Sequence, residues 1–404
     1  MFKRCQTLIG LMAMSIVITT GLLGGCERPA PGPQTESEPT DEGAGVEIPL
    51  VIGTYTGDTG SVVGSNVEPS RGLYLVNYDS ADGQLSQPVL AASIDNPSFG
   101  AIDPDKGRIY VASETEVGEV AAFQWRPGST DLNLINSVPS AGAYPCYVSL
   151  SPDMTRLAVA NYVSGNIAVY ELDPDTGAIG DSPQTRKHAG RGPNLERQEG
   201  PHAHWVEWAP EGRFLYVVDL GIDEIVGYSF DASSGRLGEG FTALKTEAGA
   251  GPRHLVFHPK KNLVYIFNEL SNSVVVASRE NDGRLTVRQT LSSLPADFSG
   301  HSQGAHIAIN ADGTHLYASN RGHDSIVVFD VAEDGQLGSP EWISTQGDWP
   351  RFFTILPDQQ TLLVANERSH NLVTFDIHAD GHLSPTGQSV QLAQPVYAGS
   401  LAAP

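Results

Sequence analysis

The sequence is poor in cysteine and in basic residues, and each shortage excludes a class of protein. Its 404 residues include three cysteines, at positions 5, 26 and 146, too few for a disulfide framework or a cysteine-rich zinc site. Lysine and arginine number 24 against 47 aspartates and glutamates, a formal net charge of -23. Such a chain repels polyanions, so we expect no nucleic-acid partner. With 40% hydrophobic residues it can still bury a large core.

The first 25 residues have the pattern of an export signal. Lys3 and Arg4 precede an apolar run over residues 8–23, which is shorter than the ~20 residues a spanning helix needs. The motif LGGC, ending at Cys26, resembles the bacterial lipobox, which implies cleavage before this cysteine and attachment of lipid to it. We therefore predict a lipoprotein signal peptide over residues 1–25. An ordinary signal peptide with a chance cysteine is the alternative.

Residues 26–48 are rich in Pro, Ser, Thr, Gly and acidic residues and contain few apolar ones. Such a segment buries too little surface to offset the entropy lost on ordering, so it is expected to be a disordered tether. Glu27 after the cysteine is more consistent with the outer membrane than with retention at the inner one. The expected location is the periplasmic side of a bacterial envelope, with the lipid as the sole membrane contact and a monomeric chain.

Residues 49–404 repeat a unit of four short apolar segments separated by turns, and no helical periodicity is evident. The first turn carries Pro, Asp or Gly, and a G-x-[LI] turn precedes the weaker fourth segment. Equivalent positions in the first turn lie 46–58 residues apart and are Pro104, Pro152, Pro210, Pro259, Ala311 and Pro357. This pattern predicts an all-β propeller of four-stranded blades.

The two ends of this region together supply a further blade. VIGTYT, starting at Val51, aligns with the second segment of a unit, and GLYLVNYDSADGQL supplies the third and fourth. PVYAGSL, starting at Pro395, matches the missing innermost segment. We therefore predict seven blades, one of them closed by N- and C-terminal strands so that no strand edge stays open. A six-bladed ring with decorative ends is the alternative.

Three columns of the repeat vary between units and carry charge. Six residues before the reference turn, the units have Ser98, Cys146, His204, Arg253, Ala305 and Arg351. The next position has Phe99, Tyr147, Trp205, His254, His306 and Phe352. Ten residues after the turn stand Glu114, Tyr162, Leu220, Glu269, Arg321 and Glu367. Inner strands begin, and second strands end, at one mouth of a propeller channel, where we expect a ring of His, Arg and Glu.

The column one position earlier is uniformly small and polar, which indicates a structural role. Its members are Ser113, Asn161, Asp219, Asn268, Asn320 and Asn366. Side chains of this kind bond to nearby backbone groups, so we expect caps at strand ends. The loop residues Arg186, Lys187, His188 and Arg191 follow no spacing rule and are expected on a solvated face.

Longer motifs carry a resemblance to a known family. They are GPNLERQEGPHAH at residues 192–204, GPRHLVFHP from Gly251, FNELSNSV from Phe267, SNRGHDSIVVFDV from Ser319 and GTYT from Gly53. In this order they resemble the seven-bladed lactonases, which include propeller-type bacterial 6-phosphogluconolactonases and fungal 3-carboxymuconate cyclases. One departure is His306 in GAHIAIN, where an acidic residue is expected.

The resemblance implies a catalytic set of His204, Arg253, Glu269 and Arg321. Guanidinium groups hold anions and meet the oxyanion of an attacked lactone, while a carboxylate or imidazole activates water. Which of Glu269 and His204 is the base stays open. Candidate substrate contacts are His202, His254, Arg197, Gln198, His306 and His323. Arg197 and Gln198 stand in an insert and either order the loop over the channel or touch substrate.

The predicted activity is hydrolysis of an anionic sugar lactone or carboxylated lactone, without metal or cofactor. A muconate-type cyclase that forms a lactone, and a non-catalytic propeller that binds or scaffolds in the envelope, remain as alternatives. Individual residues have alternatives too. His202 and His204 are two apart, as in half of a metal site; Glu269 and Arg321 would also suit a structural ion pair; and Cys146 is expected to pack in the interior without acting as a nucleophile.

Overall fold

The computed structural model describes residues 46–57 and 67–402. The predicted signal peptide 1–25, the lipidation site Cys26 and the tether up to residue 45 lie outside these residues. The described residues contain β-strands and turns but no α-helix. In that part of the chain, therefore, no helix is long and apolar enough to cross a bilayer.

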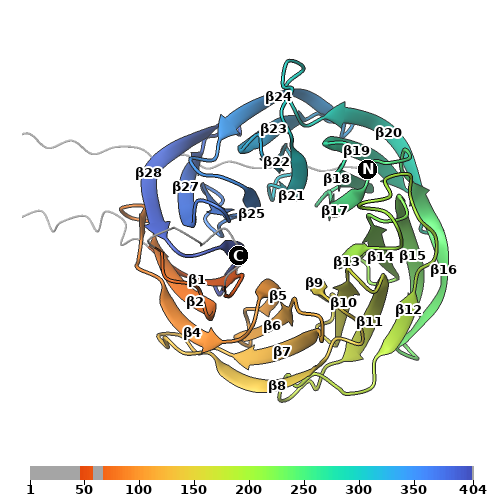
Figure 1. Cartoon of the computed structure of the whole chain (residues 1–404), viewed down its shortest axis with the longest axis horizontal. Helices are drawn as coiled ribbons and strands as arrows, with labels where there is room; N and C mark the ends of the chain where they lie inside the picture. The colour runs from red at the N-terminus through yellow and green to blue at the C-terminus, as the bar shows by residue number, and fades with distance from the viewer. Residues whose placement is uncertain (1–45, 58–66, 403–404) are drawn as a thin grey trace, which may run out of the picture. The chain divides into compact units, whose positions relative to one another are not determined.

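Seven antiparallel sheets surround a central channel as blades (Figure 1). Six of them use four consecutive strands each, with the first strand innermost. Blade 1 contains β5 (Pro97–Asp103), β6 (Arg108–Ser113), β7 (Glu119–Gln124) and β8 (Asn133–Pro139). Blade 2 contains β9 (Pro145–Leu150), β10 (Arg156–Asn161), β11 (Asn166–Glu171) and β12 (Gln184–Lys187). Blade 3 contains β13 (Ala203–Trp208), β14 (Phe214–Asp219), β15 (Glu224–Asp231) and β16 (Arg236–Lys245).

The next three blades follow the same plan. Blade 4 contains β17 (Pro252–Phe257), β18 (Leu263–Asn268), β19 (Ser273–Arg279) and β20 (Leu285–Ser292). Blade 5 contains β21 (Gln303–Ile309), β22 (His315–Arg321), β23 (Ser325–Val331) and β24 (Leu337–Ser344). Blade 6 contains β25 (Pro350–Ile355), β26 (Thr361–Asn366), β27 (Asn371–Ile377) and β28 (Leu383–Gln391).

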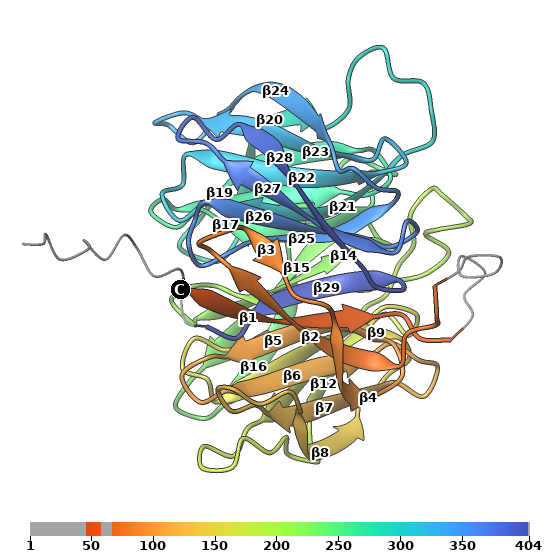
Figure 2. The same cartoon turned by 90° about the vertical axis from the view of Figure 1, so that its left-hand side faces the viewer.

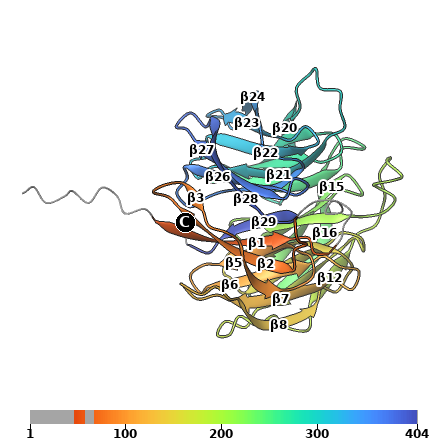
Figure 3. The same cartoon turned by 60° about the vertical axis from the view of Figure 1, so that its left-hand side comes forward.

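The closing blade joins the two ends of the domain. Its innermost strand β29 (Pro395–Ser400) pairs with β1 (Glu47–Thr54), with Leu50 opposite Ser400 and Gly53 opposite Tyr397. Figure 2 and Figure 3 both show β29 beside β1. β1 pairs in turn with β2 (Gly72–Asp79). The predicted seven-bladed ring, closed through both termini, is confirmed.

The closing blade differs from the expectation in two details. β1 begins at Glu47, two residues before the expected start of the domain at residue 49. The outer edge is split into β3 (Gln84–Leu85) and β4 (Val89–Ser93), which both pair with β2. Pro88 lies between these two pieces. Because proline has no N–H to donate, it cannot continue the hydrogen-bond ladder there.

A ring of seven aromatic or imidazole side chains fills the channel, one from each innermost strand. Its members are Phe99, Tyr147, Trp205, His254, His306, Phe352 and Tyr397. Centroids of neighbouring rings lie 3.7 to 5.3 Å apart all the way round. Each aromatic contact of this kind adds about 0.5–1.5 kcal/mol beyond the buried area. We call this set the channel ring; the last member comes from β29, so closure of the propeller also completes it.

Beyond the channel ring, at the mouth away from the charged columns, lies a cavity of about 420 Å³. Glu207, two residues after Trp205 on β13, is the charged residue in its wall. Burial raises the pKa of this carboxyl to about 7, although the hydroxyls of Ser149 and Tyr147 lie 3.3 and 3.4 Å from its oxygens. The two mouths are therefore chemically different: one is crowded with ion pairs and the other is lined mainly by small and aromatic residues.

A β-bulge in each innermost strand lets two consecutive residues reach the channel. Side chains in a regular strand alternate between faces. In six blades, one residue of the inner strand is skipped by the pairing with its neighbour: Ser98, Cys146, His204, Arg253, Arg351 and Val396. In blade 5 the register of the pairing between β21 and β22 shifts between Gly304 and Ile307. Bulges of this kind re-aim side chains, and here three of the skipped residues, His204, Arg253 and Arg351, come from the charged columns of the sequence.

Three asparagines of the small polar column tie their blades to the segment that follows the preceding blade. Amide nitrogens of Asn161, Asn320 and Asn366 donate to the carbonyls of Ser140, Ser293 and Thr345, at 2.9 to 3.1 Å. These bonds confirm the predicted capping role for these three residues, whereas the Asn268 amide donates to the Ser273 hydroxyl of its own blade at 2.9 Å. A second set of links runs from a tyrosine hydroxyl to a G-x-[LI] turn in the next blade: Tyr110 to Gly177, Tyr216 to Gly283, Tyr265 to Gly335 and Tyr317 to Gly381. The turn glycines have φ of +77° to +87°, a conformation that side chains disfavour.

Truncation after Gln394 tests the closing pair. The shortened chain loses β29 and Tyr397, so β1 gains a free edge and the neighbouring blades expose apolar surface. We expect aggregation or loss of cooperative unfolding, measured by size-exclusion chromatography and by thermal unfolding followed with circular dichroism. A chain ending at Ala402 keeps β29 and serves as the control. A soluble chain ending at Gln394 with the control's melting temperature would contradict this role of β29.

Candidate active site

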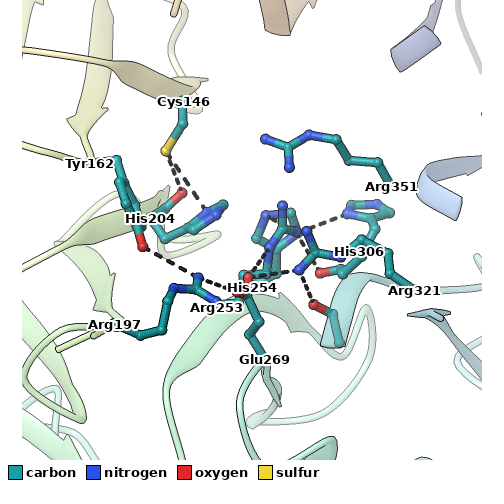
Figure 4. A network of polar contacts seen from close by, with 12 residues as sticks. Cys146, Tyr162, Arg197, His204, Arg253, His254, Glu269, His306, Arg321 and Arg351 are labelled. Atoms are coloured by element: carbon teal, nitrogen blue, oxygen red, sulfur yellow. Dashed lines mark hydrogen bonds and ion pairs between the residues drawn. The ribbon is translucent and has the colours of Figure 1, made fainter. Parts of the chain in front are cut away.

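Glu269 is the centre of an ion-pair cluster at one mouth of the channel. It directly follows β18, and its side chain is 2% exposed. One carboxylate oxygen lies 3.0 Å from Arg253 Nε and 2.8 Å from a terminal nitrogen of Arg321, and the other accepts from Arg197 (Figure 4). Burial alone would raise the pKa of this carboxyl, but the three guanidiniums hold it well below its usual range. Glu269 is therefore an ionised, fully engaged carboxylate.

Blade 4 places Arg253 beside Glu269 through local backbone structure. Arg253 is the bulged residue of β17, and Glu269 N–H donates to the carbonyl of Gly251 at 2.7 Å. Gly251 has φ of +60°, and a Cβ there would meet the Leu270 side chain at 2.4 Å, so glycine suits this turn. Arg321 arrives from the end of β22 and donates to Gly304 O at 2.8 Å. Two neighbouring blades therefore supply the core of the cluster.

Arg253 is among the most deeply buried charges of the protein, with a side chain 2% exposed. Burial and the adjacent guanidiniums of Arg321 and Arg351 lower its pKa to about 9. Its Nε makes an ion-pair contact with Glu269 that is not aligned as a hydrogen bond. Its NH1 donates to Ala305 O at 2.7 Å. A guanidinium held this rigidly is preorganised to meet negative charge that develops on a substrate.

His204 brings a neutral imidazole to the same mouth. It is the bulged residue of β13, and burial together with Arg253 lowers its pKa well below the usual value. Its Nδ1 lies 3.9 Å from Cys146 Sγ, and its Nε2 has no hydrogen-bond partner among the described residues. Burial raises the pKa of the Cys146 thiol, which stays protonated and packs in the interior as expected. His204 therefore has a ring nitrogen available for water or substrate.

The predicted contacts His254 and His306 are occupied within the channel ring. Arg253 NH1 lies 2.8 Å from His254 Nε2, and the two Nδ1 atoms of the histidines are 3.1 Å apart. Because arginine only donates, His254 accepts at Nε2 and donates from Nδ1 to His306. Burial and Arg253 lower the pKa of both imidazoles, so both are neutral. They form the floor beneath Arg253.

The insert at residues 189–201 folds onto the mouth, and its two predicted residues play different parts. Gln198 is fully buried and donates to Leu220 O and Asp223 Oδ1, at 2.8 and 2.7 Å. It holds the loop. Arg197 reaches Glu269 and lies 3.5 Å from the hydroxyl of Tyr162, with its own side chain 32% exposed. Of these two residues, therefore, Arg197 enters the cluster.

The remaining predicted histidines, His202 and His323, lie at the margin of the ion-pair cluster around Glu269 or outside it. His202 stacks on Tyr162, with ring centroids 4.5 Å apart, and its Nε2 lies 3.1 Å from Glu199. His323 lies in the turn after Arg321, where its Nδ1 is 2.7 Å from Ser325 Oγ and its ring packs against Phe298. The structure does not bring it into the network of Figure 4.

The expectation of a solvated face at His188 is wrong. Its side chain is 3% exposed, its Nδ1 lies 2.6 Å from Asp219 Oδ2 and its Nε2 lies 3.0 Å from the hydroxyl of Tyr228. Asp219 also caps the backbone N–H of His202. Both partners of His188 are distant in the sequence, so no local spacing signals the contact.

The selection of site residues from the sequence left out Arg351 with its neighbours Glu114 and Tyr55. Arg351 is the bulged residue of β25, and its guanidinium lies 3.7 Å from Glu114 and 5.1 Å from the ring centroid of Tyr55. Tyr55 donates to Glu114 at 3.0 Å. The signal was present, because Arg351 and Glu114 occupy the same repeat columns as Arg253 and Glu269.

A metal centre has no basis in the described residues. No group of three or more His, Cys, Asp or Glu side chains there is placed to hold a metal ion. His202 and His204, two apart in the sequence, both contact the ring of Tyr162, but their ring nitrogens meet different groups: those of His202 lie near Tyr162 O and Glu199, and Nδ1 of His204 lies near Cys146 Sγ. The side chains at this mouth can supply acid–base chemistry and charge stabilisation.

The family model described as Lactonase, 7-bladed beta-propeller matches residues 49–399. The chain belongs to this family. A 6-phosphogluconolactonase from Bacillus subtilis is 36% identical over 331 residues, which cover 81% of this chain and 93% of that protein. The periplasmic gluconolactonase of Pseudomonas aeruginosa superposes with a TM-score of 0.80 at 32% identity, covering 89% of this chain and 100% of that one. A putative 6-phosphogluconolactonase from Bacteroides uniformis superposes with a TM-score of 0.79 at 28% identity, covering 88% of this chain and 99% of that one. These relatives support lactonase activity.

Replacement of Glu269 tests whether this carboxylate holds the cluster together. Glu269→Gln leaves Arg253 and Arg321 buried without their counter-ion, which costs about 3–5 kcal/mol of unfolding free energy. Glu114→Gln is the matched control, since that carboxylate is more exposed and faces one guanidinium at 3.7 Å. Urea unfolding should show a clearly larger loss for Glu269→Gln. Equal losses would mean that Glu269 does not organise the mouth.

Proposed function

We propose that the protein is a lactonase, a carboxylic ester hydrolase that opens the ring ester of an anionic sugar lactone or a carboxylated lactone. Support comes from one observation: a neutral imidazole, a buried carboxylate and several guanidiniums converge at one mouth of the channel. Membership of the lactonase family and the similarity to a 6-phosphogluconolactonase agree with this chemistry. Water activation and charge stabilisation are assigned to side chains, so the reaction needs no metal or cofactor.

His204 is the better of the two candidate bases. Glu269 already faces three guanidiniums, and both of its carboxylate oxygens are engaged by them, which leaves neither oxygen available to take a proton from water. His204 is neutral and keeps Nε2 available. We assign proton transfer to His204 and the positioning of the arginines to Glu269.

The reaction then runs in two steps. His204 Nε2 takes a proton from water as the water oxygen bonds to the lactone carbonyl carbon, and the carbonyl oxygen becomes an oxyanion that faces Arg253 or Arg321. The ring C–O bond breaks next. The leaving alkoxide takes the proton back from His204, so the imidazole ends neutral and the product is a hydroxy acid.

His204→Ala should lower kcat for lactone hydrolysis by about 10²- to 10⁴-fold, the range for loss of a general base. Because the pKa of His204 is lowered, wild-type kcat/KM should hold as pH falls below 6.5, and decline only when this imidazole is protonated. The variant should lack that acid limb. EDTA should have no effect. The exposed residue His378 provides the control, and His378→Ala should retain full activity.

These assays use a panel of lactones with and without phosphate, and a folded protein checked by circular dichroism. Full activity in His204→Ala would remove the proposed base. Abolition by EDTA would overturn the metal-independent mechanism. Lactone formation from an unsaturated acid, with no hydrolysis, would assign the chain to the cyclases of the family instead.

We further propose that the protein is exported to the bacterial envelope and anchored by lipid on Cys26, at the periplasmic side of the outer membrane, as a monomer whose one partner is its small-molecule substrate. Support comes from the LGGC motif and from similarity to a periplasmic gluconolactonase. The domain itself begins its first strand at Glu47, 21 residues after Cys26.

Mass spectrometry of the mature amino terminus tests the anchor. We expect a chain that begins at Cys26 with lipid on its thiol and amino group. Cys26→Ser should move the protein from the membrane fraction to the soluble fraction. An intact leader with unmodified Cys26 would refute lipidation.

A further inference from the structure

The cavity at the second mouth contains a carboxylate without a counter-ion. Glu207 is the one residue of β13 that is not buried, and it lines this cavity of about 420 Å³. In the part of the chain that the structure describes, no lysine or arginine lines the cavity. Glu207 therefore differs from Glu269 at the active mouth, which faces three guanidiniums. A partly buried carboxylate of this kind favours the binding of a cation, because the local dielectric is low and the charge is unpaired.

Two hydroxyls of the neighbouring strand β9 position this carboxylate. Ser149 and Tyr147 donate to its two oxygens at 3.3 and 3.4 Å, distances beyond the usual range for an O–H donor. Glu207 is thus held in place but weakly stabilised, and burial raises the pKa of its carboxyl to about 7. A cation beside it would stabilise the ionised form and lower that pKa.

The floor of the cavity is aromatic. Four members of the channel ring line it, Phe99, Tyr147, Phe352 and Tyr397, and the centroids of neighbouring rings lie 3.9 to 5.3 Å apart. Aromatic rings attract ammonium groups through their negative faces, and groups of such rings bind quaternary ammonium ligands. Tyr147 belongs to this floor and its hydroxyl contacts Glu207, so the rings and the carboxylate border the same space.

This lining suits an organic cation better than a metal ion. Ca²⁺ takes about six to eight oxygen ligands and Mg²⁺ a complete octahedral set. Among the described residues, no three His, Cys, Asp or Glu side chains are placed to hold a metal ion, and Glu207 is the carboxylate of this cavity. The cavity volume falls in the range of small-molecule sites, about 300–1,000 Å³.

We propose that the second mouth is a binding site for a small organic ammonium ion, with Glu207 as its counter-ion and the aromatic floor beneath it. The other titratable groups in the wall are Tyr147, Tyr397 and His306. Burial raises the pKa of both tyrosines and lowers the pKa of the histidine, so these groups are neutral. The site does not depend on the lactonase function, since the channel ring lies between the two mouths.

Isothermal titration of the purified full chain with choline at about pH 8 tests the site. The matched probe is 3,3-dimethyl-1-butanol, which has the shape of choline with carbon in place of the charged nitrogen. Choline should bind wild type at least about 10-fold more tightly than the alcohol. Glu207→Gln keeps the size of the side chain and removes its charge, so it should weaken choline binding by about 10-fold or more and leave binding of the alcohol unchanged.

Glu239→Gln is the matched control, because this exposed carboxylate lies on β16 of the same blade, outside the cavity. It should bind choline as wild type does. In wild type, choline binding should weaken as pH falls below about 7, where Glu207 becomes protonated, whereas binding to Glu207→Gln should stay weak throughout.

Three results would overturn the site: no binding of choline to folded wild type, equal affinity of wild type for choline and the alcohol, or unchanged choline affinity in Glu207→Gln. Circular dichroism checks that each variant is folded. Lactone hydrolysis is measured separately, so failure of this site leaves the proposed function untouched, and the reverse also holds.

Discussion

The pairing of β29 with β1 is the contact on which the remaining architecture depends. It joins segments from opposite ends of the domain, so its formation closes a loop of more than three hundred residues at a large entropic cost. In return it removes the last open strand edges and completes the channel ring with Tyr397. The active mouth needs this closure, because its side chains come from successive blades and two of them, Tyr55 and Arg351, flank the closing blade.

The mouth itself concentrates charge where a folded protein ordinarily avoids it. Burying Glu269, Arg253 and Arg321 is tolerated because each carboxylate oxygen meets a guanidinium, and because Arg253 finds a further acceptor in the backbone carbonyl of Ala305. Below them the neutral pair of His254 and His306 separates the cluster from the second mouth. The result is a largely buried site in which fixed dipoles and charges act more strongly than they would in water.

Among its relatives, the chain combines similarity to phosphogluconolactonases with similarity to a periplasmic gluconolactonase. Their shared fold cannot separate a phosphorylated from an unphosphorylated substrate, because a propeller only supplies the mouth into which side chains project. The substrate is therefore selected by the side chains that line the mouth, where the proposed reaction assigns proton transfer to His204.

Much of the fold was predictable from the sequence because each blade is built from contacts between neighbouring strands. The period of the apolar segments, the turn glycines and the two unmatched ends were enough for seven blades and for their closure. The repeat columns likewise located His204, Arg253, Glu269 and Arg321. A strand register repeated in every unit carries each column to the same mouth, but the columns also contain Arg351 and Glu114, so the family resemblance was needed to select these four.

Tertiary structure decided which of these side chains meet. The bulge at Arg253, His204 and Arg351 is a matter of backbone pairing, and it turns consecutive residues toward one channel. Contacts such as His188 with Asp219 and Arg197 with Glu269 join residues 31 and 72 positions apart, and no local pattern encodes them. The sequence by itself determined the blades and the columns, since these follow from local periodicity. Only the closed ring decided the partners, because charge and burial depend on every blade that faces the channel.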